Sequence, residues 1–131
     1  MNDIQIETEI QAKGLTAPRI TPEDIEANIA ECHYFTAWQG AKLAYWSETP
    51  IDCNVEKYAI GEPNRNGPLG LLTFCVLVLR NGFTVTGESA CASPENFDAE
   101  IGRKIARENA VNKIWPLMGY ELKCRLAKGG A

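Results

Sequence analysis

The chain has 131 residues, of which 45% are hydrophobic, and this length suits a single compact domain with one core. Its formal net charge of −4 excludes the broad positive field that sequence-independent binding to DNA or RNA requires. The sequence contains neither an apolar run of about 18 residues nor a basic segment ahead of an apolar one. We therefore expect no membrane span and no secretory signal, and a cytoplasmic location.

The first 16 residues are polar and lack a sustained period, which predicts an N-terminal arm (residues 1–16) ahead of a single domain (residues 17–131). The stretch "RITPEDIEANIAE" then predicts a short helix over about residues 22–31. Thr21 is suited to cap this helix, and Pro22 fits its first position. Acidic residues follow at once, where they complement the positive end of the helix dipole.

The cysteine and histidine content argues against metal, redox and nucleophilic chemistry. The five cysteines are far apart and form no C-x-x-C pair, so we expect reduced and mostly buried thiols. His33 is the single histidine and no G-x-S-x-G elbow accompanies it, which favours a hydrogen-bonded structural role. We therefore predict no metal, no cofactor and no enzymatic activity.

A β-hairpin is the strongest structural signal in the middle of the chain. Residues 34–69 are irregular and rich in aromatic side chains, which predicts an ordered excursion packed on the core, without assignable strands. The run "LLTFCVLVLR", residues 71–80, is continuously apolar, and Asn81 and Gly82 favour a primed turn into the return strand "FTVTGE". Because the first strand is apolar on both faces, we expect it to be central and covered twice.

The segment "SPENFDAEIGRKIARENAVNKIWP" predicts a long helix that Ser93 caps, Pro94 begins and Pro116 ends. A period of 3.6 gives this helix two packing faces. One carries Ile101, Ile105 and Trp115, and nearly opposite lie the small residues Ala99, Gly102, Ala106 and Ala110. Small residues permit close approach of another backbone, for which a second copy of the same helix in a homodimer is the economical candidate.

The tail "GYELKCRL" alternates apolar and charged residues and predicts an edge strand, although one helical turn after Pro116 also fits its beginning. Together the elements predict an α+β fold. In this fold an antiparallel sheet with a central hairpin packs against the long helix of the C-terminal half and the short N-terminal helix.

Arg103 and Arg107 lie one turn apart at the margin of the small-residue face. In a two-fold pairing, four guanidiniums would come together, and an anion would relieve their repulsion. Arginine offers planar donors that match phosphate oxygens. The alternative is a solvated helix face, on which Glu100 and Glu108 form ordinary surface ion pairs.

Two further side chains have the chemistry of a nucleotide site. Phe83 follows the hairpin turn, where its ring could stack on a base, and Asn96 near the start of the long helix could bind a base edge or a ribose hydroxyl. Taken alone, the residues favour a core position for Phe83 and a helix cap for Asn96.

The chain resembles the small tailed-phage protein family of the gene-product forty-nine/sixty-six type, to which the first-type Thoeris anti-defence proteins are similar. The resemblance rests on "APRITPEDIEANI" and on the run "NGFTVTGESAC" followed by "NF", "EIGRKIA", "ENA" and "KIW". It covers the first helix and nearly all of residues 71–126, but not residues 37–69.

This resemblance implies a phage anti-defence protein that acts in the cytoplasm of the infected bacterium as a non-enzymatic sponge. Its ligand would be a cyclic ADP-ribose-type signal, held at a subunit interface of a homodimer or higher homo-oligomer. Some similar proteins also sequester cyclic di- or trinucleotides in separate pockets. The alternative is a phage accessory protein that acts by protein–protein contact and has no nucleotide ligand.

The resemblance also implies roles for individual residues. Carried over by motif, Arg103 and Arg107 of "GRKIAR" would bind phosphates. Phe83 of "GFTVTG" would stack on adenine, and Asn96 of "PENF" would hydrogen-bond the ligand. Arg19 of "APRITP" would reach the ligand from the partner chain.

Overall fold

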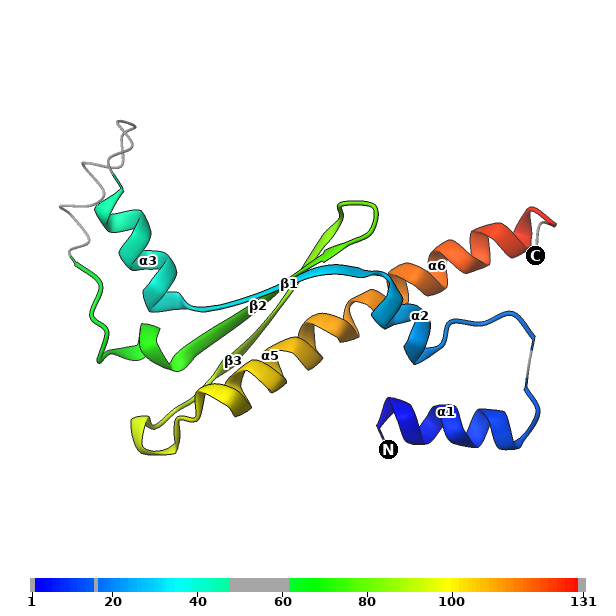
Figure 1. Cartoon of the computed structure of the whole chain (residues 1–131), viewed down its shortest axis with the longest axis horizontal. Helices are drawn as coiled ribbons and strands as arrows, with labels where there is room; N and C mark the ends of the chain where they lie inside the picture. Colours follow the sequence, from blue (N-terminus) through cyan, green and yellow to red (C-terminus); the bar gives the residue numbers. More distant parts are fainter. Residues whose placement is uncertain (1, 16, 48–61, 130–131) are drawn as a thin grey trace.

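The computed structural model describes residues 2–15, 17–47 and 62–129 (Figure 1). Its elements are the helices α1 (Asp3–Ala12), α2 (Pro22–Ala27), α3 (Ala37–Trp46), α5 (Ala99–Asn112) and α6 (Ile114–Ala127), the strands β1 (Ile29–Thr36), β2 (Leu72–Leu79) and β3 (Thr84–Ala90), and the 3₁₀ turns η1 (Pro68–Leu71) and η2 (Pro94–Asn96).

The strands form one antiparallel sheet in the order β1-β2-β3. Cys75 at the middle of β2 pairs with Tyr34 of β1 on one side and with Gly87 of β3 on the other. The long helix α5 packs along β2 and β3, and α2 lies beside the beginning of β1 (Figure 1). The predicted α+β fold, with a central hairpin, a long helix from the C-terminal half and a short N-terminal helix, is confirmed.

The hairpin turn differs from the predicted primed turn. Its loop has the three residues Arg80, Asn81 and Gly82, closed by a hydrogen bond of 2.8 Å from the Leu79 N–H to the Phe83 carbonyl. Gly82 has a positive φ of 88°, whereas Asn81 does not. The Asn81 side chain instead accepts the Phe83 N–H at 2.9 Å. The turn is therefore a three-residue loop that ends in a left-handed glycine.

The core lies between one face of β2 and the helix α5. On this face the side chains of β2 are buried at every second position, as the pleat of a strand requires. The core residues are Ile25, Cys75, Leu77, Leu79, Val85, Ala106, Ala110 and Ile114. On the opposite face, Phe74, Val76 and Val78 are only half-buried, so the expected second cover of β2 is not found in the described residues.

The small residues of α5 face the sheet and not a second helix. Gly102, Ala106 and Ala110 are buried, and Gly87 of β3 lies so close that an added Cβ would stand 2.2 Å from the Ala106 carbonyl oxygen. Ile101, on the opposite side, is 55% exposed. The prediction that this strip pairs with a second copy is therefore wrong, because the sheet already occupies it.

Both ends of the long helix also differ from the prediction. Ser93 makes no capping hydrogen bond, and Pro94 begins the separate turn η2. The cap of α5 is Asp98, whose carboxylate accepts the backbone N–H three residues later at 3.0 Å. Pro116 does not end the helical part of the chain but lies in the first turn of α6. Proline is tolerated there because the N–H that it lacks would have no partner within the helix.

Residues 119–126 belong to α6, so the predicted edge strand is wrong. A helical repeat was present in the sequence beside the alternation, because apolar residues recur every fourth position. They are Ile114, Met118, Leu122 and Leu126, of which the first is buried and the others half-buried. This stripe keeps α6 helical where a strand was expected.

The predicted N-terminal helix is confirmed at its beginning and is too long at its end. Thr21 accepts the Asp24 N–H at 3.1 Å, and the Asp24 carboxylate accepts the Thr21 N–H at 2.9 Å, as in a capping box. The helix ends at Ala27, and Ile29 already begins β1. The Asn28 carbonyl between them accepts the Arg80 N–H at 2.9 Å, which fastens this corner to the hairpin loop.

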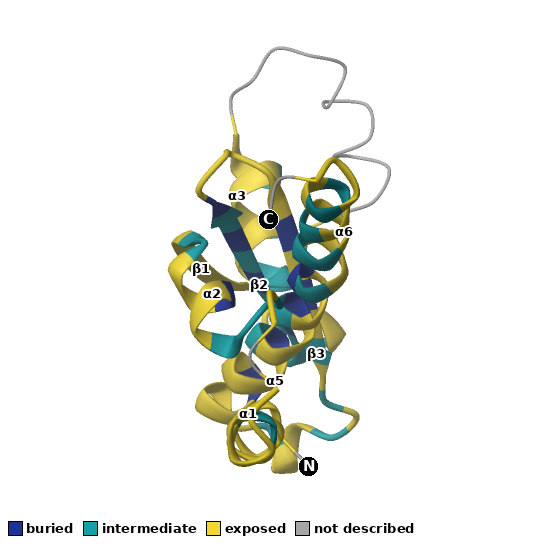
Figure 2. Cartoon of the chain, turned by 90° about the vertical axis from the view of Figure 1, so that its right-hand side faces the viewer, coloured by how far each residue is buried: buried dark blue, intermediate teal, exposed yellow. Residues whose placement is uncertain are grey.

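The polar residues before this helix form α1, which is exposed along most of its length (Figure 2). The helix is capped by Asn2, whose side chain accepts a backbone N–H at 2.8 Å. It reaches the rest of the chain through Asp3, which accepts a hydrogen bond of 3.3 Å from the Trp115 indole N–H, and through an ion pair of Glu7. The division into arm and domain remains a prediction.

The irregular middle of the chain contains β1 and α3. Phe35 at the end of β1 packs on Phe74 with ring centroids 5.7 Å apart, and the Trp38 ring of α3 carries Lys42 at 4.8 Å. Residues 48–61 lie outside the described residues. The helix α3 thus lies against the end of the sheet, but none of its residues is buried, so the predicted packing on the core is not found in this part of the described chain.

The cysteines differ in how far they are buried. The described cysteines carry free thiols, of which Cys75 is buried, Cys91 and Cys124 are half-buried and Cys32 is exposed. Cys53 lies outside the described residues. Within the described ranges, none of the helices has the length and apolarity needed to cross a membrane.

Candidate ligand-binding site

Arg103 and Arg107 lie one helical turn apart on α5, and the guanidinium of Arg107 lies beside Cys32 of β1. Residues four apart on a helix lie on nearly the same side, so the two guanidiniums are neighbours. Arg103 is exposed and has no hydrogen bond or ion pair with any residue that the structure describes. It is therefore a free cation next to the partly covered Arg107.

Arg107 is held by a carboxylate far away in the sequence. Its Nη2 donates to both oxygens of Glu26 in α2, at 3.0 and 3.1 Å. Burial lowers the pKa of Arg107, but the hydrogen bonds that it donates to Glu26 outweigh this and the net shift is upward. The guanidinium is thus permanently charged and already paired within the chain.

Two side chains of β1 lie beside this guanidinium. Tyr34 and Cys32 point toward the α5 side of the sheet, where the Cys32 and Cys75 sulfurs are 3.8 Å apart. Desolvation by burial raises the pKa of Tyr34 to about 12 and that of Cys75 to about 12. Both groups stay protonated at neutral pH, so they can donate hydrogen bonds but are unsuited to act as a base or a nucleophile.

Phe83 and Asn96 lie at opposite ends of the sheet in one chain. Phe83 comes just before β3 and is 54% exposed, whereas Asn96 follows β3 in the turn η2 and is also exposed. The seven residues of β3 separate them by about 20 Å. Phe83 is therefore not a core residue and Asn96 is not the cap of α5, and a single chain does not bring the two together.

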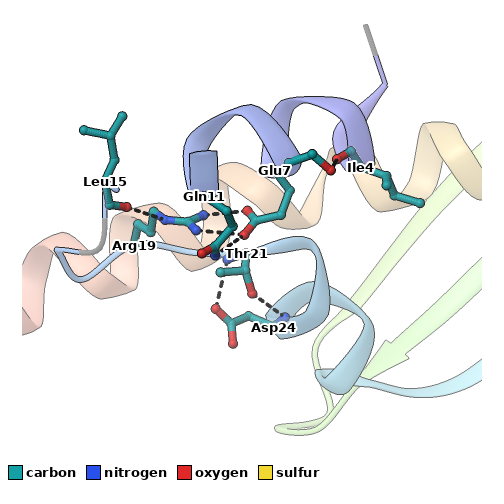
Figure 3. Close-up of polar contacts among 8 residues, drawn as sticks. Ile4, Glu7, Gln11, Leu15, Arg19, Thr21 and Asp24 are labelled. Carbon is teal, nitrogen blue, oxygen red and sulfur yellow. Dashed lines mark hydrogen bonds and ion pairs between the residues drawn. The ribbon is translucent and has the colours of Figure 1, made fainter. Parts of the chain in front are cut away.

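Arg19 is engaged near the N-terminal helix (Figure 3). Its Nη1 and Nη2 donate to the two carboxylate oxygens of Glu7 at 2.6 and 2.8 Å, and its Nε donates to the Leu15 carbonyl at 3.2 Å. The hydrogen bond from Arg19 and a further one from Gln11 lower the pKa of Glu7 to about 2. Within one chain Arg19 thus fastens α1, away from Arg103 and Arg107.

A surface cleft of about 680 Å³ lies between α1, α2 and α5. Its lining includes the cations Lys104 and Arg107 together with the carboxylates of Asp3, Glu26 and Glu108. The three acids outnumber the two cations, and Glu26 already pairs with Arg107, so the cleft in a single chain does not favour an anion.

Sequence reasoning missed two neighbours of Arg107, Glu26 and Tyr34. The signal for Tyr34 was the stretch "ECHYFT": read as a strand, it puts Tyr34 and Cys32 on the same face of the sheet.

The described residues contain no group of three or more histidine, cysteine, aspartate or glutamate side chains that could hold a metal ion. His33 is hydrogen-bonded, as predicted, with 2.9 Å between its Nε2 and the Glu31 Oε1 on the exposed side of β1.

Comparisons with known proteins identify the family of the chain but add no individual relative. No curated protein and no solved structure matches it. One family model does match, over residues 20–126, which include β1, the hairpin, α5 and most of α6 but neither α1 nor Arg19. The chain therefore belongs to the phage protein (N4 Gp49/phage Sf6 gene 66) family.

Proposed function

We propose that this phage protein binds a cyclic ADP-ribose-type signalling nucleotide and sequesters it without cleaving it, in the cytoplasm of the infected bacterium. The observation that carries the proposal is the exposed and unpaired Arg103 one helical turn from Arg107. Two phosphates of a cyclic dinucleotide-like ligand match two neighbouring guanidiniums in charge and in donor geometry. Cyclic di- and trinucleotides present the same chemistry and are further candidate ligands.

The energetics of such a site are compatible with sequestration. Nanomolar affinity corresponds to about −12 kcal/mol. Charge-assisted hydrogen bonds contribute about 1.5–3 kcal/mol each, and stacking of a base on an aromatic ring such as that of Phe83 contributes about 1–3 kcal/mol. Asn96 would add amide hydrogen bonds from a second copy, because β3 separates it from Phe83 by about 20 Å within one chain. The sum therefore approaches the required value only in a preformed site between copies.

The side chains that could perform chemistry are not arranged for it, which supports binding without cleavage. The single histidine, His33, is hydrogen-bonded to the Glu31 carboxylate. Among the described residues it has no hydrogen bond to a serine or a cysteine that it could activate. Cys75 is the buried thiol of the sheet face that packs on α5. Burial raises its pKa to about 12 and keeps the thiol in its protonated, unreactive form. A sponge needs neither group for chemistry.

Titration calorimetry with cyclic ADP-ribose isomers and cyclic oligonucleotides tests this function, followed by recovery of the nucleotide after denaturation. We expect one of these ligands to bind with nanomolar affinity and to be recovered intact. Arg103→Glu should abolish uptake without loss of stability, because Arg103 has no partner in the described chain. Recovery of an altered nucleotide would show an enzyme instead.

Lys104→Glu is the matched control for Arg103→Glu. It introduces the same change of charge one residue away, where Lys104 makes a surface ion pair of 3.4 Å with Glu100 and borders the acidic cleft between α1, α2 and α5. Uptake should therefore remain within a few fold of the unmodified protein. Equal loss of binding in both variants would mean that the ligand senses only the overall charge.

A second candidate function is contact with another protein, without a nucleotide. Ile101 is 55% exposed and Ile105 is 45% exposed, one turn apart on the side of α5 away from the sheet. Exposed apolar pairs of this kind suit a protein interface. Absence of heat with every nucleotide, together with loss of a co-purifying protein in Ile101→Ser, would favour this alternative.

A further inference from the structure

Two cysteines that lie far apart in the sequence are in contact on the α5 face of the sheet. The sulfurs of Cys32 and Cys75 are 3.8 Å apart, although 43 residues separate them along the chain. In the ladder of β1 and β2, Cys75 lies opposite Tyr34, two residues along β1 from Cys32. The two cysteines are therefore diagonal neighbours on adjacent strands, a relation that their spacing in the sequence does not predict.

The two thiols differ in their access to solvent. Cys32 is exposed on the edge strand β1, whereas Cys75 is buried in the core on the central strand β2. Burial also raises the pKa of Cys75 to about 12, so its thiol is protonated as well as shielded. A water-soluble oxidant therefore reaches Cys32 first, and Cys75 is the thiol directly behind it.

The surroundings of Cys32 suit reaction with an oxidant. The guanidinium of Arg107 and the hydroxyl of Tyr34 lie beside its sulfur. Cysteines that react with oxidants lie in partly exposed, electropositive surroundings, and a second thiol within reach often resolves the product. Cys32 has this exposure and this cation, and Cys75 has the position of the second thiol.

We propose that Cys32 and Cys75 form a reversible disulfide when a hydroperoxide oxidises the protein. The Cys32 sulfur attacks the outer peroxide oxygen, the O–O bond breaks, and the thiol proton passes to the departing oxygen, which leaves a sulfenic acid. The Cys75 sulfur then attacks the Cys32 sulfur, the S–O bond breaks, and the hydroxyl leaves with the Cys75 proton as water. The two thiols together lose two electrons, which the peroxide takes up.

The second step is possible although Cys75 is protonated. With a pKa of about 12, roughly one thiol in 10⁵ is ionised at neutral pH. Groups held in contact react as if present at about 10⁵–10⁸ M, which offsets this small fraction. The buried thiol is thus inert toward solutes but can react with a sulfenic acid that lies against it.

Closing the disulfide requires a small movement of β1. The sulfurs must approach by about 1.8 Å, because they are 3.8 Å apart and an S–S bond is about 2.0 Å long. Cys75 is fixed by hydrogen-bonded neighbours on both sides, whereas β1 pairs with β2 alone in the described chain. Because α5 packs mainly on β2 and β3, the edge strand is the part that can move.

The ladder also explains why the bond is reversible. Diagonal positions have Cα atoms about 7–8 Å apart, beyond the usual range of about 4.4–6.8 Å for a disulfide. The bond therefore closes against the preferred spacing of the strands, and disulfides of this kind are the more easily reduced ones. We expect it to form under oxidant and to be broken again by a small thiol.

Treatment of the reduced, unmodified protein with hydrogen peroxide tests the pair, with free thiols and intact mass measured after denaturation. We expect the loss of two thiols and of two hydrogen atoms, and peptide mapping without reductant should recover Cys32 linked to Cys75. Dithiothreitol should restore both thiols. Unchanged thiols, a covalent dimer or a link to another cysteine would overturn the proposal.

Variants of the two cysteines separate the two steps. Cys32→Ser should abolish the disulfide, and because the side chain is exposed the fold should be unaffected. Cys75→Ala should leave Cys32 as a sulfenic acid, one oxygen heavier and trapped by dimedone, because the second thiol is missing. If this core variant folds poorly, the peptide map of the unmodified protein still decides. A disulfide that persists in Cys32→Ser contradicts the assignment.

Cys91→Ser is the matched control. Cys91 is half-buried, and its thiol donates to the Ser93 carbonyl at 3.1 Å, with no other sulfur in contact within the described ranges. The disulfide should form in this variant at a rate within about a factor of two of the unmodified protein. Loss of the disulfide in Cys91→Ser would show that a different pair reacts. None of these outcomes involves a nucleotide, so the thiol pair and the proposed function are tested separately.

Discussion

Gly87 is the residue at which the sheet and α5 come closest. A Cβ at this position would stand 2.2 Å from the Ala106 carbonyl oxygen and 2.3 Å from the Ala110 nitrogen, both of them backbone atoms of a helix. Neither can rotate away, so the helix must move off the sheet. We expect Gly87→Ala to lower the free energy of unfolding by about 3 kcal/mol, measured by denaturant titration.

Gly119 provides the control for this substitution. It lies within α6, and a Cβ there would meet nothing within 4 Å. Because alanine is the better helix former, Gly119→Ala should raise the free energy of unfolding by roughly 0.5–1 kcal/mol. If Gly87→Ala proved as stable as Gly119→Ala, the close packing of α5 on β3 would be incorrect.

The ion pair of Arg19 and Glu7 predicts how pH acts on α1. The pKa of Glu7 is lowered from 4.5 to about 2 by its hydrogen bond from Arg19. A carboxyl with a lowered pKa stabilises the folded arrangement above its unfolded pKa of 4.5, and this contribution disappears as the pH falls through about 2. We therefore expect α1 to detach from the rest of the chain between these pH values.

Trp115 reports on this detachment, since its indole bonds Asp3 of α1 and it shares a cleft with Ile6 and Ile10. Its fluorescence should shift on acidification, and Glu7→Gln should produce the shift already at neutral pH. Glu9→Gln is the control, because Glu9 pairs only with Lys13 of the same helix at 3.3 Å. An identical pH response in Glu7→Gln and the unmodified protein would contradict the assignment.

At the scale of elements, the beginning of α5 is determined by Asp98 and not by Ser93. We expect Asp98→Ala to lower the free energy of unfolding by about 1 kcal/mol, because the carboxylate accepts an otherwise unpaired N–H of the first turn. Ser93→Ala should change it by less than about 0.5 kcal/mol, since Ser93 makes no capping bond. Denaturant midpoints compare the two, and equal losses would contradict this assignment.

Local signals explain which elements the sequence predicts. The hairpin and the start of α2 depend on neighbouring residues, such as Asn81 with Gly82, or Thr21 with Pro22, and the structure has both. The strand β1 was missed because its side chains are exposed on both faces, so no alternation of burial marks it. The tail was misread because Tyr120 and Cys124 added a period of two to a helical stripe.

The candidate site is predictable from the sequence only in part, because its electrostatics are long-range. The spacing of Arg103 and Arg107 places them on one side of a helix, as expected. No local pattern indicates that Arg107 pairs with Glu26, which lies 81 residues earlier. Nor does one indicate that the small residues of α5 pack on the sheet at Gly87. These facts depend on how α2, α5 and the sheet pack, which single segments do not determine.

At the scale of the whole molecule, Glu26 couples α2 to the proposed ligand site. Its carboxylate takes both hydrogen bonds that Arg107 Nη2 makes, and a phosphate must compete with it. Glu26→Gln removes this counter-charge while keeping the size of the side chain. We expect the affinity for the cyclic nucleotide to rise about fivefold, equivalent to about 1 kcal/mol, in calorimetric titration.

Glu23→Gln is the matched control for this substitution. Glu23 is exposed in the first turn of the same helix, and its replacement removes the same charge. It should leave the affinity unchanged within a factor of two, because a general increase in positive field at this distance is screened by salt. Unchanged affinity in Glu26→Gln would place the ligand away from Arg107, whereas equal gains in both variants would show that only net charge matters. A gain confined to Glu26→Gln identifies Arg107 as a ligand-binding side chain that the single chain keeps neutralised until its anion arrives.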